Sequence, residues 1–421
     1  MTEQINVFLQ KHAISADSIS TSAVLNDFKA EMNKGLSGEP SSLKMIPTFI
    51  TPRNNLPCNE SVIVIDAGGT NLRTALVHFD NNSTPEIEQI NRHRMPGTSG
   101  LLTAAEFYAA LKEYLAPIIS KSNRIGFCFS YPAEITPERD GRLIHWTKDI
   151  QVPELEGRLV GAGLLAALGP DGADKKLTLL NDTIATLLAG KAQSSEESSY
   201  IGLILGTGTN MAYIEKNNNI TKLDIPDGQQ AINVESGGFA LAPACDFDRK
   251  LDADTINPGE YLFEKMIAGL YRGRLILLAL QAAANEMLLS EICAKQILNL
   301  TGLEAFQVDQ FMRNNNESPL YSCSPNDKDK NTIRNIINAI YDRTAKLTAL
   351  NISAAVLKNP PAPGQSTCIN IDGSTYYKSF GFQNMTEKYI AEILGQNNIN
   401  YKLMHVDEAP IIGAAIGGII N

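Results

Sequence analysis

The sequence predicts an α/β protein with two lobes, on three observations. The chain has 421 residues, a length at which a single hydrophobic core has normally split into domains. Strand patterns and helix patterns alternate along it. An apolar strand enters a turn of glycine, threonine and asparagine and leaves as a second strand at 62–80, and the same order recurs about 140 residues later, at 200–216. The repetition predicts two related β-hairpins.

The composition predicts an ordinary globular protein that binds a small molecule. Hydrophobic residues make up 43% of the chain and charged residues 19%, which leaves little room for disorder. The net charge of −10, with no clustered Lys/Arg segment, argues against a nucleic-acid partner.

The start of the chain and its cysteines predict a cytoplasmic location with no membrane partner. MTEQINVFLQ lacks the charged and apolar regions of a signal peptide, and no apolar run reaches the roughly 18 residues of a membrane span. The six cysteines include no C-x-x-C pair, so we expect reduced, mostly buried thiols and neither a zinc knuckle nor a disulfide framework.

In the first half, helical spacing of apolar residues within 1–45 predicts a leading helix. The stretch from 63 to 95 alternates between strand patterns and polar turns, which predicts a three-stranded antiparallel meander. A helix is expected at 103–120, followed by short buried strands at 124–132 and 177–182.

Helices dominate the second half. The helix at 184–192 should be capped by Asn181, Asp182 or Thr183. After the second hairpin, long helices are expected at 260–289 and 331–358. The apolar tail at 409–420 is too short to cross a membrane and predicts a core helix.

The two glycine turns suggest a phosphate site. Glycine lets backbone N–H groups approach an anion without a Cβ in the way, and threonine adds a hydroxyl donor. Each turn taken alone is equally an ordinary hairpin bend. Neither fits the P-loop, which requires a lysine and a following helix, or the dinucleotide-binding fingerprint, whose third glycine opens a helix.

Two aspartates follow buried strands. Asp66 could orient Mg²⁺ through water, because one or two carboxylates together with substrate phosphates usually hold that ion, or it could simply shape the turn. Asp182 could cap the next helix, and it could also accept a hydroxyl proton late in phosphoryl transfer.

Three further side chains suggest a neutral sugar as substrate: Asn210, Glu235 and Glu264. Carboxylates and amides accept hydrogen bonds from vicinal hydroxyls, which suits them to a sugar. Glutamates are usually solvated, so only a shared site would support this interpretation.

Eight blocks of the chain, taken together, resemble the hexokinases of the eukaryotic type. Their order and spacing agree with that family over some 230 residues. The blocks are KMIPTFI (44–50), DAGGTNLR (66–73), GFCFSYP (126–132), HWTKD (145–149), LLNDT (179–183), GLILGTGTN (202–210), NVESGGF (233–239) and NPGEYLFEKMIAGLYRG (257–273).

The resemblance implies an actin-like, two-lobed fold of the ribonuclease-H type, with sugar and nucleotide in the cleft between a small and a large lobe. The small lobe would comprise 60–180, with a C-terminal helix at 410–421 packing back onto it. The large lobe would comprise 1–59 and 181–409. Each lobe would carry one phosphate hairpin.

The resemblance also implies an activity, the transfer of the γ-phosphoryl group of ATP to the 6-hydroxyl of glucose and of mannose or fructose. Asp182 would accept the hydroxyl proton, and Lys148 and Arg73 would act with it. The residues implied for the sugar site are Ser130, Pro132, Thr147, Lys148, Asn181, Asp182, Asn210, Glu235 and Glu264.

The nucleotide site follows from the same resemblance, with Asp66 as the residue that orients Mg²⁺ through water and the enzyme a monomer or homodimer. The residues implied for this site are Asp66, Gly68, Gly69, Thr70, Asn71, Arg73, Gly206, Thr207, Gly208, Thr209, Gly373, Ser374 and Gly413.

The chain departs from the family pattern in two places. Ser236 stands where a tryptophan commonly follows the sugar-binding glutamate, and Pro410 and Ile411 stand in the place of a Gly-Ser-Gly turn at the adenosine, where Gly413 alone persists. The only tryptophan, Trp146, is expected to pack and fix its loop rather than to stack on sugar.

Other functions remain open at this stage. A sugar sensor without turnover would keep the fold but is expected to lose Asp182 or the phosphate turns, and these are present. An ATPase of the actin or chaperone kind has no use for the sugar-site residues. A two-carboxylate glycosidase would explain Glu235 and Glu264 but not the hairpins. The bacterial glucokinase and repressor group would require a cysteine-rich zinc signature, which is absent.

Overall fold

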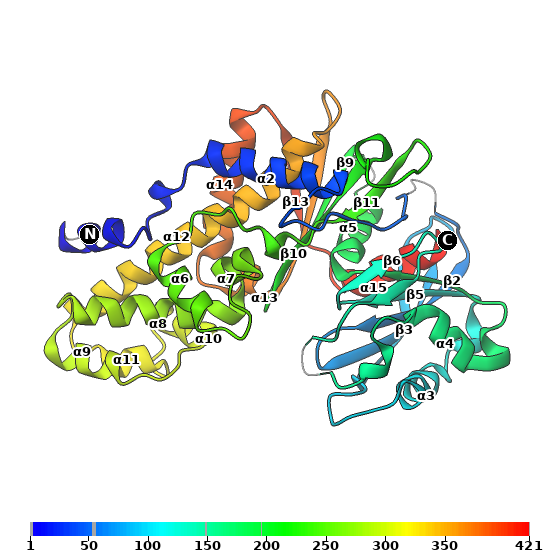
Figure 1. Ribbon diagram of the computed structural model, residues 1–421, viewed down its shortest axis with the longest axis horizontal. Coiled ribbons are helices and arrows are strands. Elements are labelled where there is room, and N and C mark those ends of the chain that lie inside the picture. The colour runs from blue at the N-terminus through cyan, green and yellow to red at the C-terminus, as the bar shows by residue number, and fades with distance from the viewer. Residues whose placement is uncertain (1–2, 53–55, 148–149, 195, 421) are drawn as a thin grey trace.

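Two β-sheets with the same strand topology organise the protein, one in each lobe (Figure 1). The computed structural model describes residues 3–52, 56–147, 150–194 and 196–420. In each sheet an antiparallel meander of three strands is followed by two parallel strands on its other side. The hairpins predicted from the repeated turn are Glu60–Ala67 with Asn71–Phe79 in one sheet and Ser199–Leu205 with Thr209–Lys216 in the other. The second sheet has one further short strand, Ile46–Pro47, beside its meander.

The five-stranded sheet of the small lobe has the order β4-β3-β2-β5-β8. The antiparallel pairing of its first three strands confirms the predicted meander. All five strands fall within 60–180: β2 (Glu60–Ala67), β3 (Asn71–Phe79), β4 (Pro85–Arg94), β5 (Arg124–Phe129) and β8 (Lys176–Leu180). Helices α3 (Ala104–Leu115) and α4 (Val160–Leu168) and a two-stranded sheet of β6 (Ala133–Ile135) and β7 (Gly141–Leu143) complete this lobe.

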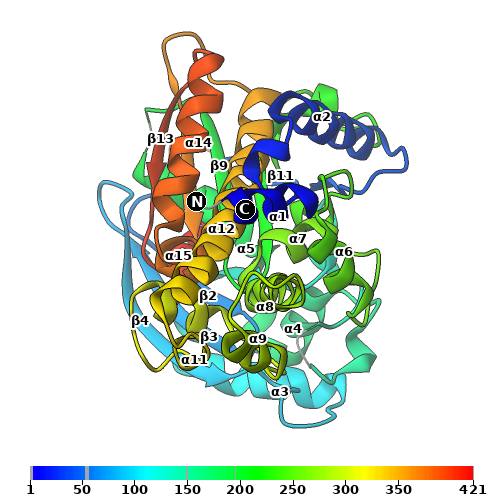
Figure 2. The ribbon, with the colours of Figure 1, turned by 90° about the vertical axis from the view of Figure 1, so that its left-hand side faces the viewer.

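The six-stranded sheet of the large lobe has the order β1-β11-β10-β9-β12-β13. Its strands are β1 (Ile46–Pro47), β9 (Ser199–Leu205), β10 (Thr209–Lys216), β11 (Gln229–Asn233), β12 (Ser366–Asp372) and β13 (Asn400–Met404). One hydrophobic core lies between this sheet and the helices α2 (Thr21–Ser37), α12 (Asp327–Lys358) and α14 (Phe382–Gln396). Figure 2 shows α14 running beside β13, and α12 packs against α14.

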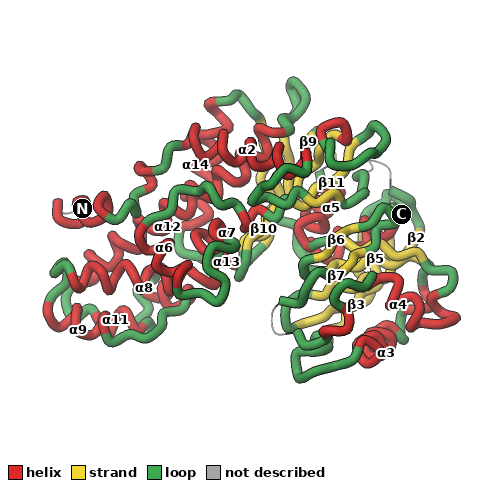
Figure 3. Tube along the Cα trace, viewed as in Figure 1, coloured by secondary structure: helices red, strands yellow, loops and turns green. Residues whose placement is uncertain are grey.

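A helical region extends the large lobe away from the sheets (Figure 3). It has its own hydrophobic core. Its helices are α1 (Glu3–Lys11), α6 (Asp246–Ala253), α7 (Leu262–Ile267), α8 (Gly269–Asn285), α9 (Glu291–Leu298), α10 (Ala305–Met312) and α11 (Pro319–Cys323). The predicted leading helix is two helices, α1 and α2. Among the described residues, no helix has both the length and the apolar character that a membrane span requires.

The single helix predicted at 260–289 is instead two helices, α7 and α8, because Ala268 between them is extended, with φ −78° and ψ 154°. The break frees the N–H groups of Gly269 and Leu270 from the helix ladder. They donate to the carbonyl groups of Gly206 and Thr207 in the second glycine turn. A long-range contact therefore overrides local helix propensity at this point.

Two helices cross between the sheets and join the lobes. Helix α5 (Asp182–Gln193) follows the last strand of the small-lobe sheet but packs on β9 and β12 of the other sheet. Helix α15 (Ala409–Ile419) follows the last strand of the large-lobe sheet and packs on β2, β5 and β8. The two helices also pack against each other, and a separate hydrophobic core surrounds them.

Glycines make the close approach of these helices possible. A Cβ on Gly413 of α15 would lie 1.9 Å from the carbonyl oxygen of Ala185 in α5. A Cβ on Gly126 of β5 would lie 1.9 Å from the carbonyl oxygen of Ala414. Both obstacles are backbone atoms, which cannot move aside as a flexible side chain can. We call these two contacts, of α15 with α5 and of α15 with β5, the glycine seam.

Gly413, which the resemblance assigned to the nucleotide site, has a packing role in the structure. The residue is buried in the interior of α15, with α5 directly against its Cα. Helix packing therefore accounts for glycine at this position.

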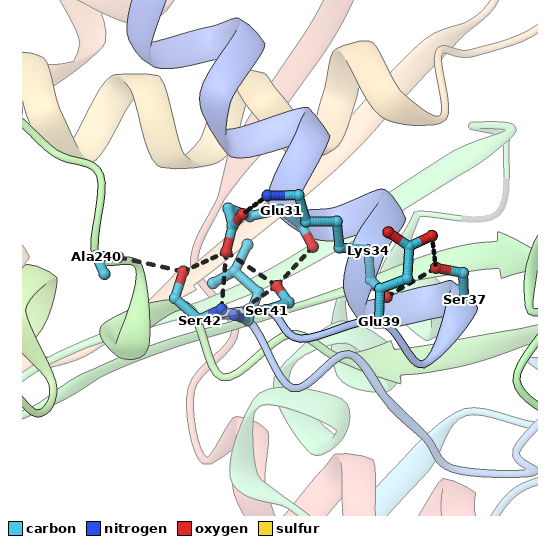
Figure 4. A network of polar contacts seen from close by, with 8 residues as sticks. Glu31, Lys34, Ser37, Glu39, Ser41, Ser42 and Ala240 are labelled. Carbon is cyan, nitrogen blue, oxygen red and sulfur yellow. Dashed lines mark hydrogen bonds and ion pairs between the residues drawn. The ribbon is translucent and has the colours of Figure 1, made fainter.

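A buried carboxylate anchors the N-terminal segment to the large lobe (Figure 4). Glu31 of α2 accepts hydrogen bonds from Lys34 Nζ (2.7 Å), from the Ser42 N–H (2.8 Å) and from the hydroxyls of Ser42 and Ser41 (2.9 and 3.2 Å). Ser42 in turn accepts the N–H of Ala240. Burial opposes the charge, but the hydrogen bonds from Lys34, Ser42 and Ser41 outweigh it and lower the pKa of Glu31 to about 2.

We expect Gly413→Ala to destabilise the protein by about 1–3 kcal/mol, because a methyl group must be forced between two helix backbones. Alanine favours helices by itself, so a loss of stability would come from packing alone. Gly395→Ala in α14 is the matched control, since a Cβ there meets no atom within 4 Å. Denaturant unfolding measures both, and equal stability of Gly413→Ala and wild type would contradict the seam.

We expect Glu31→Gln to lower the free energy of unfolding at neutral pH by about 1–3 kcal/mol, because buried donors lose a charged acceptor. The folded-state pKa of Glu31 is lowered from 4.5 to about 2, so its contribution is complete above pH 4.5 and is lost as the pH falls through 2. Thermal unfolding against pH should show the two proteins converging in acid. The exposed Glu39, changed to Gln, should have little effect at any pH.

Candidate active site

One glycine in each turn, Gly68 in the first and Gly206 in the second, could carry a Cβ without a clash. Neither Gly68 nor Gly206 has a left-handed φ. A Cβ would lie 3.5 Å from the Asn71 oxygen in the first turn and 3.8 Å from the Gly373 Cα in the second. Neither conformation nor packing inside the protein therefore requires glycine at these two positions. Glycine at both positions keeps the adjacent backbone free of a Cβ.

The structure narrows the set of backbone N–H groups in the turns that could bind an anion. The N–H of Gly68 donates to the Asn71 oxygen (3.2 Å), and the N–H of Gly206 donates to the Gly208 oxygen (2.9 Å). These two N–H groups are therefore used in hydrogen bonds within the turns. Thr70 and Thr207, at the tips, are exposed, so donors for an anion come from the tip residues.

Glu264 stabilises the second turn through a hydrogen bond. Its Oε2 accepts the N–H of Thr209 at 2.9 Å, and a Cβ on Gly208 would lie 2.7 Å from the same oxygen. The hydroxyl of Thr209 donates to the Ile204 oxygen at 2.9 Å, and Thr209 is buried. The N–H and the hydroxyl of Thr209, which was assigned to the nucleotide site, are thus both used in hydrogen bonds within the protein. Glu264 stabilises the turn by accepting one of them.

Arg73 lies between two carboxylates. Its Nε and Nη2 bind Oδ2 of Asp66 at 2.7 and 2.6 Å, and its Nη1 binds Glu408, the residue before α15. Burial disfavours the guanidinium charge, but the charges of Asp66 and Glu408 outweigh it and raise the pKa of Arg73. A phosphate would therefore have to share this guanidinium with the carboxylates or displace one of them.

Asp182 lies at the centre of the candidate site. Asn181 caps α5 by accepting the N–H and the hydroxyl of Thr183, at 2.9 and 2.7 Å, which makes Asp182 the first residue of the helix. Within the described part of the chain, no hydrogen bond or ion pair engages the Asp182 carboxylate. A negative charge at a helix N-terminus is stabilised by the helix dipole.

Carboxyl groups of both lobes respond to the charge of Asp182. Burial raises the pKa of Asp66 in the small lobe, and Asp182 raises it further, against the opposing effect of Arg73. Burial likewise raises the pKa values of Glu235 and Asp372 in the large lobe, with Asp182 again adding to the effect. The charge of Asp182 thus acts on carboxyl groups of both lobes.

A hydrogen-bonded cluster holds Glu235. Its Oε1 accepts the side-chain amides of Asn233 (2.7 Å) and Asn210 (3.1 Å), and Oδ1 of Asn210 accepts the N–H of Ser236 at 3.1 Å. Glu235 itself adopts the left-handed region, with φ 58°. Such a strained residue persists where the surroundings hold it, and it is often functional. Ser236, which replaces the family tryptophan, is fully buried, and its hydroxyl accepts the amide of Asn351 at 3.4 Å.

The remaining residues expected at the sugar lie on the loops after β5 and β7. The Ser130 N–H donates to the Ala67 oxygen at 3.2 Å, and Pro132 accepts the N–H of Ile144 at 2.9 Å. Thr147 is half-buried, whereas Lys148 lies outside the described residues. Trp146 packs as predicted: its ring contacts those of Phe107, Phe129 and Tyr131, and its Nε1 donates to Val152 at 2.7 Å.

At the expected adenosine end, Gly373 and Ser374 lie beside the second turn. Gly373 has φ 122°, and a Cβ there would lie 2.3 Å from the Leu205 oxygen, so only glycine fits. Ser374, at the start of α13 (Ser374–Lys378), is exposed. Pro410 and Ile411 form the first turn of α15, and Ile411 is fully buried.

The donor atoms fit a magnesium ion. Carboxylate oxygens, water and substrate phosphates are the ligands Mg²⁺ prefers, and Asp66, Asp182 and Asp372 supply carboxylates around the turns. In the part of the chain that the structure describes, no three His, Cys, Asp or Glu side chains could hold a metal together. A cation here would therefore need phosphate or water ligands.

A cavity of about 530 Å³ lies elsewhere, at the opposite ends of β2, β5 and β8. It is lined by polar residues, among them Glu60 and Arg124, which bind each other at 2.8 Å. None of the residues discussed above lines it, so it is separate from the candidate site.

Three residues of the site were not predicted from the sequence: Asn233, Asp372 and Glu408. Asn233 and Asp372 end strands β11 and β12, beside residues that were singled out. Their place at a strand end beside a glycine or a carboxylate is a signal that could have found them. Glu408 contacts Arg73 across 335 positions of sequence, and no local pattern indicates that contact.

Comparison with known proteins identifies the family. Two family models described as hexokinase match the chain, one over residues 4–192 and the other over residues 200–420. Hexokinase-1 of Schizosaccharomyces pombe is 32% identical, over 93% of this chain and 86% of that protein. Hexokinase-1 of Spinacia oleracea is 30% identical, over the same shares of the two chains.

Solved structures show the same fold. A hexokinase from Schistosoma mansoni, complexed with glucose, superposes with a TM-score of 0.81 over all of both chains at 22% identity. A ROK hexokinase from Thermus thermophilus gives a TM-score of 0.53 at 15% identity, over 86% of this chain and 98% of the other. The predicted two-lobed, actin-like fold of sugar kinases is confirmed. The chain belongs to the hexokinase family, and it is a sugar phosphotransferase that acts on a hexose.

Proposed function

We propose that this hexose kinase transfers the γ-phosphoryl group of ATP to the 6-hydroxyl of glucose, and also of mannose or fructose. We also propose that 60–180 with 410–421 form the small lobe and the rest the large lobe, that the enzyme is cytoplasmic, and that it acts as a monomer or homodimer.

The position of Asp182 carries this proposal. Asp182 begins a helix that follows the small-lobe sheet and packs on the large-lobe sheet, and its charge acts on Asp66 and on Glu235. A hydroxyl bound near Glu235 would then meet a base that no other described side chain engages. A hydroxyl attacking phosphorus must lose its proton late in the reaction, and Asp182 is the acceptor.

The sugar would be held by acceptors on one side and a loop on the other. Glu235 and Asn210 are already oriented by their mutual hydrogen bond, which limits the reorganisation that substrate binding demands. Ser130, Pro132, Thr147 and Lys148 would complete the contacts. Ser236 and Asn351 leave a buried polar pair beside Glu235 where the family has tryptophan, and this pair is where a difference in hexose preference would arise.

The phosphates would lie at the tips of the two turns. The residues proposed to contact them are Gly69, Thr70, Asn71, Thr207, Lys148 and Arg73. Mg²⁺, when bound, would neutralise charge on the phosphates, with Asp66 positioned to orient its water ligands. Asp66 and Glu408 meanwhile hold Arg73 in place.

A sugar sensor with the same fold is the second candidate. It would bind glucose without releasing ADP. The Asp182 carboxylate, which no described side chain engages, favours the enzyme, because a sensor needs no base at this position.

We expect Asp182→Asn to lower kcat by about 10²- to 10⁴-fold, because the amide cannot accept the hydroxyl proton. Hexose binding should survive, since the amide keeps the shape of the side chain. A coupled ADP-release assay with glucose, mannose, fructose, glucosamine and N-acetylglucosamine, together with calorimetry of hexose binding, measures both.

The exposed Asp171, changed to Asn, is the matched control and should behave as wild type. Full activity of Asp182→Asn would exclude this base. Glucose binding by wild type without any ADP release would favour the sensor instead.

We expect Asn233→Ala to move the acid limb of kcat/KM for hexose to higher pH. Burial raises the pKa of Glu235, and the hydrogen bond from Asn233 opposes that rise. Loss of the amide should raise the pKa further, so Glu235 takes up a proton at a higher pH and becomes a poorer acceptor for the sugar. The exposed Asn218, changed to Ala, should leave the pH profile unchanged. A profile of Asn233→Ala that matches wild type would show that Glu235 does not limit hexose use.

A further inference from the structure

In each glycine turn, two consecutive carbonyl groups at matching sequence positions accept hydrogen bonds. The stretches Asp66–Asn71 and Leu205–Asn210 correspond residue by residue when their threonine-asparagine pairs are aligned, so that Ala67 matches Gly206 and Gly68 matches Thr207. Both pairs of carbonyl oxygens accept hydrogen bonds from a neighbouring segment.

In the second turn, backbone groups supply these bonds. The Gly206 oxygen accepts the N–H of Gly269 at 2.9 Å, and the Thr207 oxygen accepts the N–H of Leu270 at 3.2 Å. The hydroxyl of Thr375 adds a third bond, to Gly206, at 2.7 Å. The break between α7 and α8 makes the first two donors available.

In the first turn, a side chain replaces the second backbone donor. The Ala67 oxygen accepts the N–H of Ser130 at 3.2 Å, just as its counterpart Gly206 accepts a backbone N–H. The next carbonyl, that of Gly68, accepts the hydroxyl of Tyr131, and the Gly69 oxygen lies 3.1 Å from the same hydroxyl. Tyr131 therefore binds two consecutive carbonyl groups of the turn.

Holding a carbonyl group also sets the direction of the adjacent N–H. The peptide unit is planar and trans, so its C=O and N–H point to opposite sides, and the described chain contains no cis peptide bond. With the Gly68 and Gly69 oxygens turned toward Tyr131, the N–H groups of Gly69 and Thr70 face away from it. These are the tip donors that the proposed function assigns to phosphate.

We propose that Tyr131 is a positioning residue for the phosphate-binding turn: its hydroxyl keeps the N–H groups of Gly69 and Thr70 facing the nucleotide. This inference rests on the proposed function, because it assigns the anion at the turn to a nucleotide phosphate.

The tyrosine ring is fixed well enough for this role. Tyr131 is 3% exposed, and its ring centroid lies 4.9 Å from those of Phe129 and Trp146. Burial, and then the charge of Asp66, raise the pKa of Tyr131, so the hydroxyl keeps its proton and remains a donor.

The glycines make such a restraint necessary. A peptide unit between two glycines can rotate at little steric cost, and rotation would present a carbonyl oxygen to the phosphate in place of an N–H. Tyr131 sits between Ser130 and Pro132, both assigned to the sugar, so one short segment serves both substrates.

The test is Tyr131→Phe, which keeps the ring and removes only the hydroxyl. We expect the KM for ATP and the calorimetric Kd of its non-hydrolysable analogue AMPPNP to rise about fivefold to tenfold, the effect of losing roughly one hydrogen bond. The KM for the hexose that wild type phosphorylates should stay within twofold of wild type. The split is expected because the hydroxyl contacts the carbonyl groups of the phosphate turn.

Tyr108→Phe is the matched control. Tyr108 is a buried tyrosine of α3 in the same lobe, and no described residue hydrogen-bonds its hydroxyl. This variant should leave both KM values unchanged. Thermal unfolding of both variants reports any loss of stability.

Two results would overturn the proposal: an unchanged Kd for AMPPNP in Tyr131→Phe, or equal rises in the constants for hexose and nucleotide, which would indicate general damage. Failure of the proposed function is a different result, since wild type itself would then neither phosphorylate a hexose nor bind AMPPNP, and the inference would fall with it.

Discussion

The rest of the site depends on the glycine seam, where α15 packs against α5 and β5. Each helix leaves one sheet and packs on the other, so the seam fixes where the two lobes meet. The same helices begin at functional groups: Asp182 is the first residue of α5, and Glu408 directly precedes α15. Since backbone atoms oppose any added Cβ at Gly413 and Gly126, a shift of either helix would displace Asp182, the proposed base, together with Glu408, the partner of Arg73.

Buried charge is the second constraint on the site. Asp66, Glu235 and Asp372 all have raised pKa values because burial disfavours their ionised forms. Arg73 partly offsets this for Asp66, and two asparagine amides do so for Glu235. Such a concentration of carboxyl groups repels a polyphosphate unless a cation enters with it. The arrangement therefore suits a substrate that arrives as a metal complex.

The two turns receive the hydrogen bonds on their carbonyl groups from different kinds of donor. The second takes its donors from the start of a helix, and the first takes one from a backbone N–H and one from the Tyr131 hydroxyl. Every substitution except proline keeps a backbone N–H, whereas Tyr131→Phe removes the hydroxyl. In the small-lobe turn, the second of the two consecutive carbonyl groups therefore depends on a side-chain donor, whereas in the other turn both carbonyl groups have a backbone donor.

The sequence by itself determined the local elements and the residue types of the site. Alternation and helical spacing predicted the meander, the second hairpin and the capped helix at Asn181, because these depend on neighbours along the chain. Only the tertiary structure decided how residues far apart are used. The predicted helix at 260–289 is interrupted at Ala268, and the freed N–H groups bind a turn that is distant in sequence. Gly413 lies in a helix contact, and Arg73 pairs with Glu408. These outcomes depend on surfaces that meet after folding, and no periodicity within a single segment encodes them.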